Sequence, residues 1–129
     1  MDYDPEIAPN PAEWLSLDEQ ERIDLIEDHH KALRIKLPNA KAHAVFHAIV
    51  ENQIAEGLES VARAMVRLQR EGLSRHDALH AISSVAAEYV YELMNSNAPG
   101  DADTALARYN AAVERLTAKT WRDQYGAQD

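Results

Sequence analysis

The chain has 129 residues, of which 46% are hydrophobic, and it carries a formal net charge of −9 and no cysteine. This length fits one domain with one core, and without cysteine a metal site would have to use His, Asp and Glu. The acidic charge opposes binding to phosphate backbones, and neither a leader peptide nor a bilayer-crossing run is evident. We therefore expect a soluble, cytoplasmic domain that binds neither nucleic acid nor membranes.

The amino-terminal segment differs from the remainder of the chain. Residues 1–15 contain three prolines and little periodicity, which predicts an extended arm that docks through Trp14 and Leu15. Helical periodicity then dominates over 16–125, and no strand pattern or phosphate-binding loop interrupts it. We expect an all-α fold, with an arm followed by a single helical-bundle domain of about five helices.

The first predicted helix precedes the most apolar part of the chain. Ser16 and Glu19 form a capping-box pattern, and apolar residues then recur at helical spacing, which predicts a helix over about 17–35 with His30 on its apolar stripe. A break and an asparagine cap follow, and residues 40–56 are apolar almost all round, as in a central helix.

Gly57 leaves two architectures open, because the apolar face continues beyond it without a change of phase. If the helix runs straight through, Gly57 costs about 1 kcal/mol and the rod ends near Gly72. If Gly57 caps the helix, the chain reverses there and again at Gly72, before a helix over about 74–94. We favour the turn. A last helix is expected over about 101–121.

Histidines recur at four-residue spacing in two places. His43, His47 and Glu51 lie on one face of their helix, and His76 and His80 repeat the spacing later in the chain. Two reversals of the chain would bring both pairs, and His30, to one level of the bundle. That arrangement places the polar residues of the buried stripes where they can satisfy one another.

Imidazole and carboxylate groups on facing helices are the usual ligands of bundle metal sites. The sequence therefore predicts a site for zinc, iron or manganese. The candidate ligands are His30, His43, His47, Glu51, His76 and His80, with Glu27 and Glu88 as second candidates. No catalytic residue and no substrate are predicted.

The order of these residues resembles that of hemerythrin, with His30 on one helix, His47-x3-Glu51 on the next and His76-x3-His80 after it. The resemblance implies a helical bundle with a metal centre. Hemerythrins take further ligands from a His and an Asp on their last helix, where this chain has no histidine. We therefore do not predict oxygen carriage.

Residues 39–93 also resemble a family of small, uncharacterised bacterial helical proteins. The shared pattern is Asn39-x3-His43-x3-His47 with Glu51 nearby, followed later by a second His-x3-His. The resemblance covers somewhat under half of the chain and implies a helical fold. It implies no activity.

Two other functions remain open. In the first, the protein is an interaction module whose histidines form a buried hydrogen-bonded network without metal. Apolar residues on all sides of the predicted helix over 40–56 favour a homodimer. The dipeptide His76–Asp77 would alternatively belong to a metal-dependent phosphohydrolase of the HD type, although Asp77 also fits the third position of a helix cap. A chelator separates the network from metal binding, because only the network predicts an unchanged melting temperature. The phosphohydrolase predicts metal-stimulated turnover of simple phosphoesters.

Overall fold

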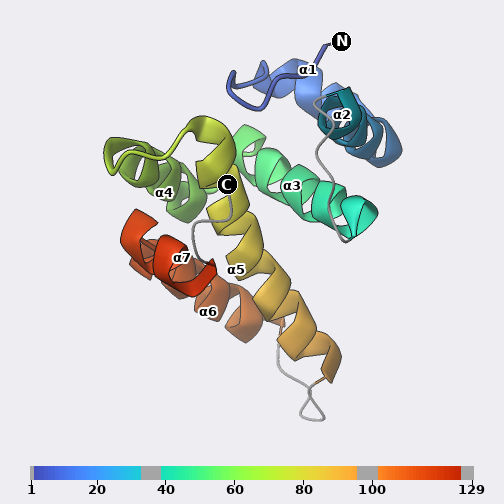
Figure 1. Cartoon of the computed structure of the whole chain (residues 1–129). Coiled ribbons are helices and arrows are strands. Elements are labelled where there is room, and N and C mark those ends of the chain that lie inside the picture. The colour runs from blue at the N-terminus through green and yellow to red at the C-terminus, as the bar shows by residue number, and fades with distance from the viewer. Residues whose placement is uncertain (1, 33–38, 96–101, 126–129) are drawn as a thin grey trace.

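The structure is a computed structural model that describes residues 2–32, 39–95 and 102–125 (Figure 1). It is 80% helical, and the described residues contain no strand, which confirms the all-α prediction. Seven helices are present in them where about five were expected. They are α1 (Pro11–Ser16), α2 (Glu19–Ala32), α3 (Ala40–Ala55), α4 (Glu59–Arg70), α5 (Arg75–Asn95), α6 (Ala102–Arg115) and α7 (Ala118–Tyr125).

The first additional helix, α1, lies within the segment that was expected to be extended. Asn10 caps it, because its side-chain oxygen accepts a hydrogen bond of 3.0 Å from the Glu13 amide. Pro11 occupies the first helical position, where the lost N–H would have no partner in any case. Trp14 is fully buried as predicted, whereas Leu15 is exposed.

The capping box before α2 lies two residues later than the sequence suggested. The Glu21 amide donates to Asp18 Oδ1 at 2.8 Å, and the Asp18 amide donates to Glu21 Oε1 at 3.5 Å. Ser16 instead donates its hydroxyl to a carbonyl of α1. Two overlapping patterns of the same kind compete here, and the one that leaves α1 intact is formed.

The second additional helix arises from a break in the segment predicted as one helix over 101–121. Thr117 and Thr120 exchange hydrogen bonds of 3.1 Å between their amides and side chains, which starts α7. Arg67 on α4 donates to the Leu116 carbonyl at 2.9 Å and so satisfies the end of α6. Because the apolar periodicity continues across this break, the sequence pattern did not reveal the break.

The two turns between α3 and α5 confirm the reversing architecture. Gly57 has φ of 78° and Gly72 has φ of 105°, in the left-handed region that glycine adopts without steric cost. The chain therefore leaves α3, forms α4 and returns as α5, within one or two residues of the predicted ranges 40–56 and 74–94. The continuous rod does not exist.

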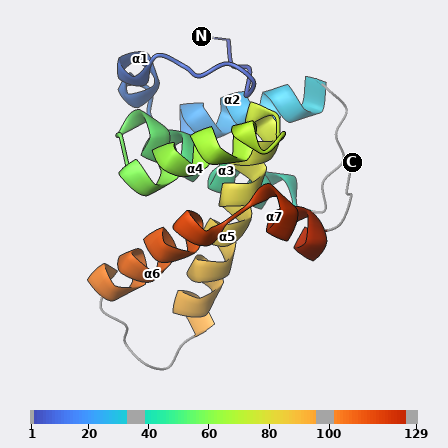
Figure 2. The same ribbon diagram turned by 90° about the vertical axis from the view of Figure 1, so that its left-hand side faces the viewer.

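Helix α3 lies at the centre of the fold. It packs against α1 and α2 on one side and against α5 on another, while α4 packs mainly against α5 and α6 (Figures 1 and 2). The carboxyl half of α5 and the amino half of α6 extend away from α1 and α2 in both views. None of the described helices is both long and apolar enough to cross a membrane.

Two groups of buried apolar side chains stabilise the bundle. The small core lies between α1, α2 and α3, and its buried members are Trp14, Ile23, Ile26, Ala44 and Ala48. The large core is built from α3 to α7 and includes the fully buried Leu68, Leu79, Ile82 and Val113. Helix α3 contributes to both cores, and it packs against α2 and α5, the other two helices that carry histidines.

Candidate metal centre

Four histidines from three helices converge at one point of the bundle. One ring nitrogen from each of His30, His47, His76 and His80 lies within 4.8 Å of the others. His30 comes from α2, His47 from α3, and the other two from α5. His30 and His47 are buried, and the α5 pair is half-buried. The single histidine and the two histidine pairs therefore meet, as the turn at Gly57 requires.

Two further histidines border this four-histidine cluster. His43 Nε2 lies 2.9 Å from His80 Nε2, and its ring centroid is 4.9 Å from that of His30. His29 is half-buried, with its ring centroid 5.8 Å from that of His30 and 6.1 Å from that of His76. All six histidines of the chain thus gather at one place, and His43 and His29 lie at its edge.

The contacts between α3 and α5 run in opposite order along the two helices. Near the end of α3, Glu51 pairs with Arg75 in the first turn of α5. Earlier on α3, His43 contacts His80, one turn further along α5. The carboxyl end of α3 therefore meets the amino end of α5, and α4 is an excursion to one side. The two reversals bring the histidine pairs together without placing α4 between them.

The backbone decides which nitrogen of His30 is available. His30 Nδ1 lies 2.8 Å from the Ile26 carbonyl, one turn earlier in α2. A carbonyl oxygen can only accept, so Nδ1 carries the proton and Nε2 presents a lone pair. This lone pair faces His76 Nε2 at 3.3 Å. Nε2 is therefore the nitrogen through which His30 could bind a metal ion.

A chain of three side chains fixes the proton of His47. Arg75 donates two hydrogen bonds of 2.8 Å to the Glu51 carboxylate, and the Tyr3 hydroxyl donates to the same carboxylate at 2.5 Å. Because the Tyr3 hydroxyl uses its proton in the hydrogen bond to Glu51, its oxygen accepts a hydrogen bond from His47 Nε2 at 2.9 Å. His47 Nδ1 then carries a lone pair, and it is buried without a hydrogen-bond partner.

The site favours neutral imidazoles. Burial is the largest cause that lowers the pKa values of His43 and of the four-histidine cluster, and repulsion from neighbouring imidazoles adds to it. The pKa falls to about 4 for His43 and His76 and to about 2 for His80. It is also lowered for His30 and lies well below its ordinary value for His47. Neutral imidazole is the form that binds metal ions.

The three predicted carboxylate ligands lie outside the four-histidine cluster. Glu51 borders it, but Arg75 and Tyr3 hold its carboxylate. Glu27 forms an ion pair of 3.9 Å with Lys31 one turn along α2, and Glu88 accepts a hydrogen bond of 2.8 Å from Gln124 of α7. The cluster is therefore a nitrogen site, with one carboxylate beside it that is already neutralised.

Tyr3 and Arg75 were missed by the sequence analysis. The arm has no periodicity from which the docking of Tyr3 could be inferred. Arg75 did give a signal: a cation in the first turn of a helix opposes the helix dipole, so it needs a specific anion. Its side chain is only 9% exposed, which makes the ion pair with the fully buried Glu51 obligatory.

The dipeptide His76–Asp77 separates into two environments. His76 is part of the four-histidine cluster, whereas Asp77 is exposed and is not among the groups that could hold a metal ion. The Asp77 amide donates to Ser74 Oγ at 3.1 Å, as expected for a helix cap. The geometry therefore gives the phosphohydrolase hypothesis no His–Asp pair at the cluster.

Comparison of the chain with known protein families, with curated proteins and with solved structures gives no significant match. The function must therefore be inferred from the histidines and their partners.

Proposed function

We propose that this protein binds one divalent transition-metal ion through His30, His47, His76 and His80. The observation that supports it most is the lone pair of His47 Nδ1, which is buried and unpartnered. The ring that carries it has its centroid 5.6, 5.5 and 5.7 Å from those of His30, His76 and His80. Buried polar atoms are nearly always hydrogen-bonded, and an exception calls for an explanation such as an ion. The Ile26 carbonyl and His76 are partners of the His30 ring nitrogens, and His80 is a partner of His43, but His47 Nδ1 is left without one.

The size of the cluster suits a single ion. Nitrogen ligands at about 2.0 to 2.1 Å from a tetrahedral ion lie about 3.4 Å from one another. The four nitrogens lie within 4.8 Å, so inward shifts of under about 1 Å per ring would complete a four-coordinate site.

Zinc is the metal that we propose. Imidazole nitrogen suits zinc, copper, iron and nickel, whereas manganese prefers carboxylate and water oxygens. Arg75 and Tyr3 hold Glu51, and none of the described carboxylates belongs to the cluster, so it does not suit manganese. Four protein ligands are also typical of closed zinc sites, which leave no coordination position for a water.

A closed site on three helices supports a structural or regulatory role rather than hydrolysis. The ion would connect α2 to α3 and α5, and so join the small core to the large core. Ligands at residues 30, 47, 76 and 80 are dispersed in the unfolded chain, so that binding free energy would contribute to folding free energy.

Metal analysis of protein without a histidine tag tests the proposal. We expect about one equivalent of zinc per chain, and about one in the control variant His29→Gln, whose imidazole lies outside the four-histidine cluster. His47→Gln should bind far less. Under about half an equivalent in the wild-type protein after incubation with zinc would contradict the proposal.

Thermal unfolding separates this function from a metal-free histidine network. We expect a chelator to lower the melting temperature of the wild-type protein and of His29→Gln, but not that of His47→Gln, which has no metal to lose. If the chelator leaves the wild-type melting temperature unchanged, the histidines act as a network without metal.

A further inference from the structure

The amino-terminal arm reaches the metal centre from a distant part of the chain. We propose that Tyr3 is a positioning residue of this centre, which holds the proton of His47 on Nε2 and thereby leaves Nδ1 as the metal ligand. The inference rests on the proposed metal-binding function. It extends that function to a side chain that touches no metal and lies 44 residues before its histidine partner.

The direction of each hydrogen bond follows from the end of the network that is fixed. Arg75 can only donate, and its two bonds of 2.8 Å leave the Glu51 carboxylate as an acceptor. The Tyr3 hydroxyl lies 2.5 Å from Glu51 Oε2, and of these two groups only the hydroxyl has a proton to donate. That proton points to Glu51, and the phenol oxygen is left to accept from His47.

His30 provides the internal comparison. Its proton is held by the Ile26 carbonyl of the same helix, so this tautomer is available whenever α2 is formed. Among the residues that the structure describes, no backbone carbonyl does the same for His47, whose proton goes to the Tyr3 hydroxyl. In the absence of Tyr3, His47 is free to carry its proton on Nδ1, where it would block the metal. The arm is therefore part of the site.

The remaining contacts of the arm make this assignment specific. The carbonyl of the fully buried Pro5 accepts a hydrogen bond of 2.8 Å from Arg75, and Glu6 Oε1 accepts one of 3.1 Å from the His76 amide. The arm is thus held on two of the three helices that supply ligands, on α3 through Tyr3 and on α5 through Pro5 and Glu6. Outer partners of this kind orient metal-bound histidines, and their loss typically costs about 10- to 100-fold in metal affinity.

The Tyr3→Phe variant tests the proposal, and Tyr109→Phe is its matched control. Tyr109 is buried and also donates one hydrogen bond, of 2.7 Å to Gln53, but it belongs to the large core. We expect Tyr3→Phe to raise the zinc dissociation constant by about 10- to 100-fold, measured by competition with a chromophoric chelator, and Tyr109→Phe to leave it unchanged. Equal affinity of Tyr3→Phe and wild type, or equal loss in both variants, would overturn the role of Tyr3.

A second measurement does not depend on any variant. Long-range ¹H–¹⁵N spectra of the metal-free protein should show His47 protonated on Nε2 and His30 protonated on Nδ1. A proton on His47 Nδ1 would refute the inference. If the wild-type protein binds no zinc at all, the proposed metal site is wrong. If the wild-type protein binds zinc and Tyr3→Phe binds it equally well, the metal site stands and only the positioning role of Tyr3 is wrong.

Discussion

The small core and the large core are stabilised in different ways. The large core brings together buried aliphatic side chains from α3 to α7, among them Leu68, Leu79 and Ile82. The small core between α1, α2 and α3 has five buried members, two of which are alanines. Since apolar burial is worth about 25 cal/mol per Å², the small core contributes much less, and α1 and α2 must be held in part by polar contacts.

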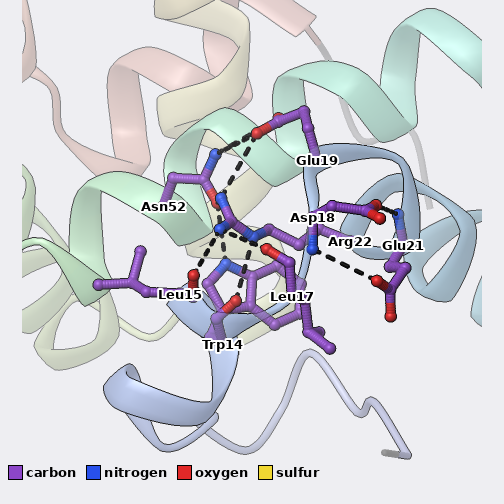
Figure 3. A network of polar contacts seen from close by, with 8 residues as sticks. All are labelled: Trp14, Leu15, Leu17, Asp18, Glu19, Glu21, Arg22 and Asn52. Carbon is purple, nitrogen blue, oxygen red and sulfur yellow. Dashed lines mark hydrogen bonds and ion pairs between the residues drawn. The ribbon is translucent and has the colours of Figure 1, made fainter.

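Two polar networks supply those contacts. Figure 3 shows the first, in which the side-chain oxygen of Asn52 on α3 accepts a hydrogen bond of 2.9 Å from Trp14 Nε1 and one of 3.1 Å from Arg22. Arg22 also donates to the carbonyls of Leu15 and Leu17, and so joins α1 to α2 (Figure 3). The second network is the histidine cluster with Tyr3, Glu51 and Arg75. The comparison shows that this bundle is apolar on one side and held by hydrogen bonds on the other.

Acid should produce the largest effect, and it should destabilise the small core more than the large core. In the folded protein, the pKa values of His43 and of the four-histidine cluster lie below the ordinary value of 6.5, at about 4 for His43 and His76. The unfolded chain therefore binds more protons between these values, so stability is highest above pH 6.5 and is lost as the pH falls toward 4. Each unit of pKa shift corresponds to about 1.4 kcal/mol, reduced by solvent screening for half-buried rings.

Circular dichroism of metal-free protein under denaturant, as a function of pH, measures this loss. Amide exchange should show that α2 opens before α4, since α4 contributes no histidine to the cluster. Constant stability from pH 7 to pH 4.5 would mean that the folded protein protonates its histidines as readily as the unfolded chain does.

Removal of the metal should produce the next largest effect. A ligand that binds only the folded state at 100 times its dissociation constant stabilises that state by about 2.7 kcal/mol. We expect a chelator to remove about this much at that zinc concentration, and to increase amide exchange in α2 more than in α6. Equal increases in both helices would show that the ion does not preferentially stabilise the small core.

Asn52→Ala should cost about 1 to 3 kcal/mol, because the indole N–H of the buried Trp14 loses its acceptor and Arg22 loses one of its acceptors. Asn110→Ala is the control beside the large core, where Asn110 accepts a single bond of 2.8 Å from Ser60. Urea unfolding should show the greater loss for Asn52→Ala. A greater loss for Asn110→Ala would contradict the view that hydrogen bonds matter more in the small core.

The smallest effect is expected from Gly57→Ala, at about 1 kcal/mol. The cost is conformational, because φ is 78° and a Cβ at this position would meet no atom within 4 Å. Gly57→Asn should cost less, since asparagine adopts the left-handed region more readily. Zinc affinity should stay unchanged in both variants, because the turn leads to α4 and not to a ligand. Equal stability of the alanine and asparagine variants would show that the turn carries no strain.

Local patterns in the sequence predicted much of the fold. The caps at Asn39 and Ser74 and the glycine turns at 57 and 72 lie where expected, because each depends on neighbouring residues alone. The break at Thr117 was missed, since its cap lies within a segment whose apolar periodicity continues. Propensity and periodicity cannot show an interruption that a distant arginine helps to stabilise.

The candidate site was predicted in part. Four-residue spacing placed histidines on buried stripes, and the reversal at Gly57 brought them together. The same spacing placed Glu51 beside them as an expected ligand, but spacing cannot show that Arg75 competes for a carboxylate. The contribution of Tyr3 depends on how the arm docks, which is set by tertiary hydrogen bonds and not by any repeat in the sequence.

The opposite order of contacts along α3 and α5 has a consequence for finding such centres in other proteins. Because the end of one helix meets the start of the other, the chain between them is free to vary in length without altering the ligands. A search should therefore look for His-x3-His-x3-Glu and, at any later distance, Arg-His-x3-His, here residues 43–51 and 75–80. The arginine that neutralises the glutamate would distinguish such a centre from one in which the carboxylate binds the ion.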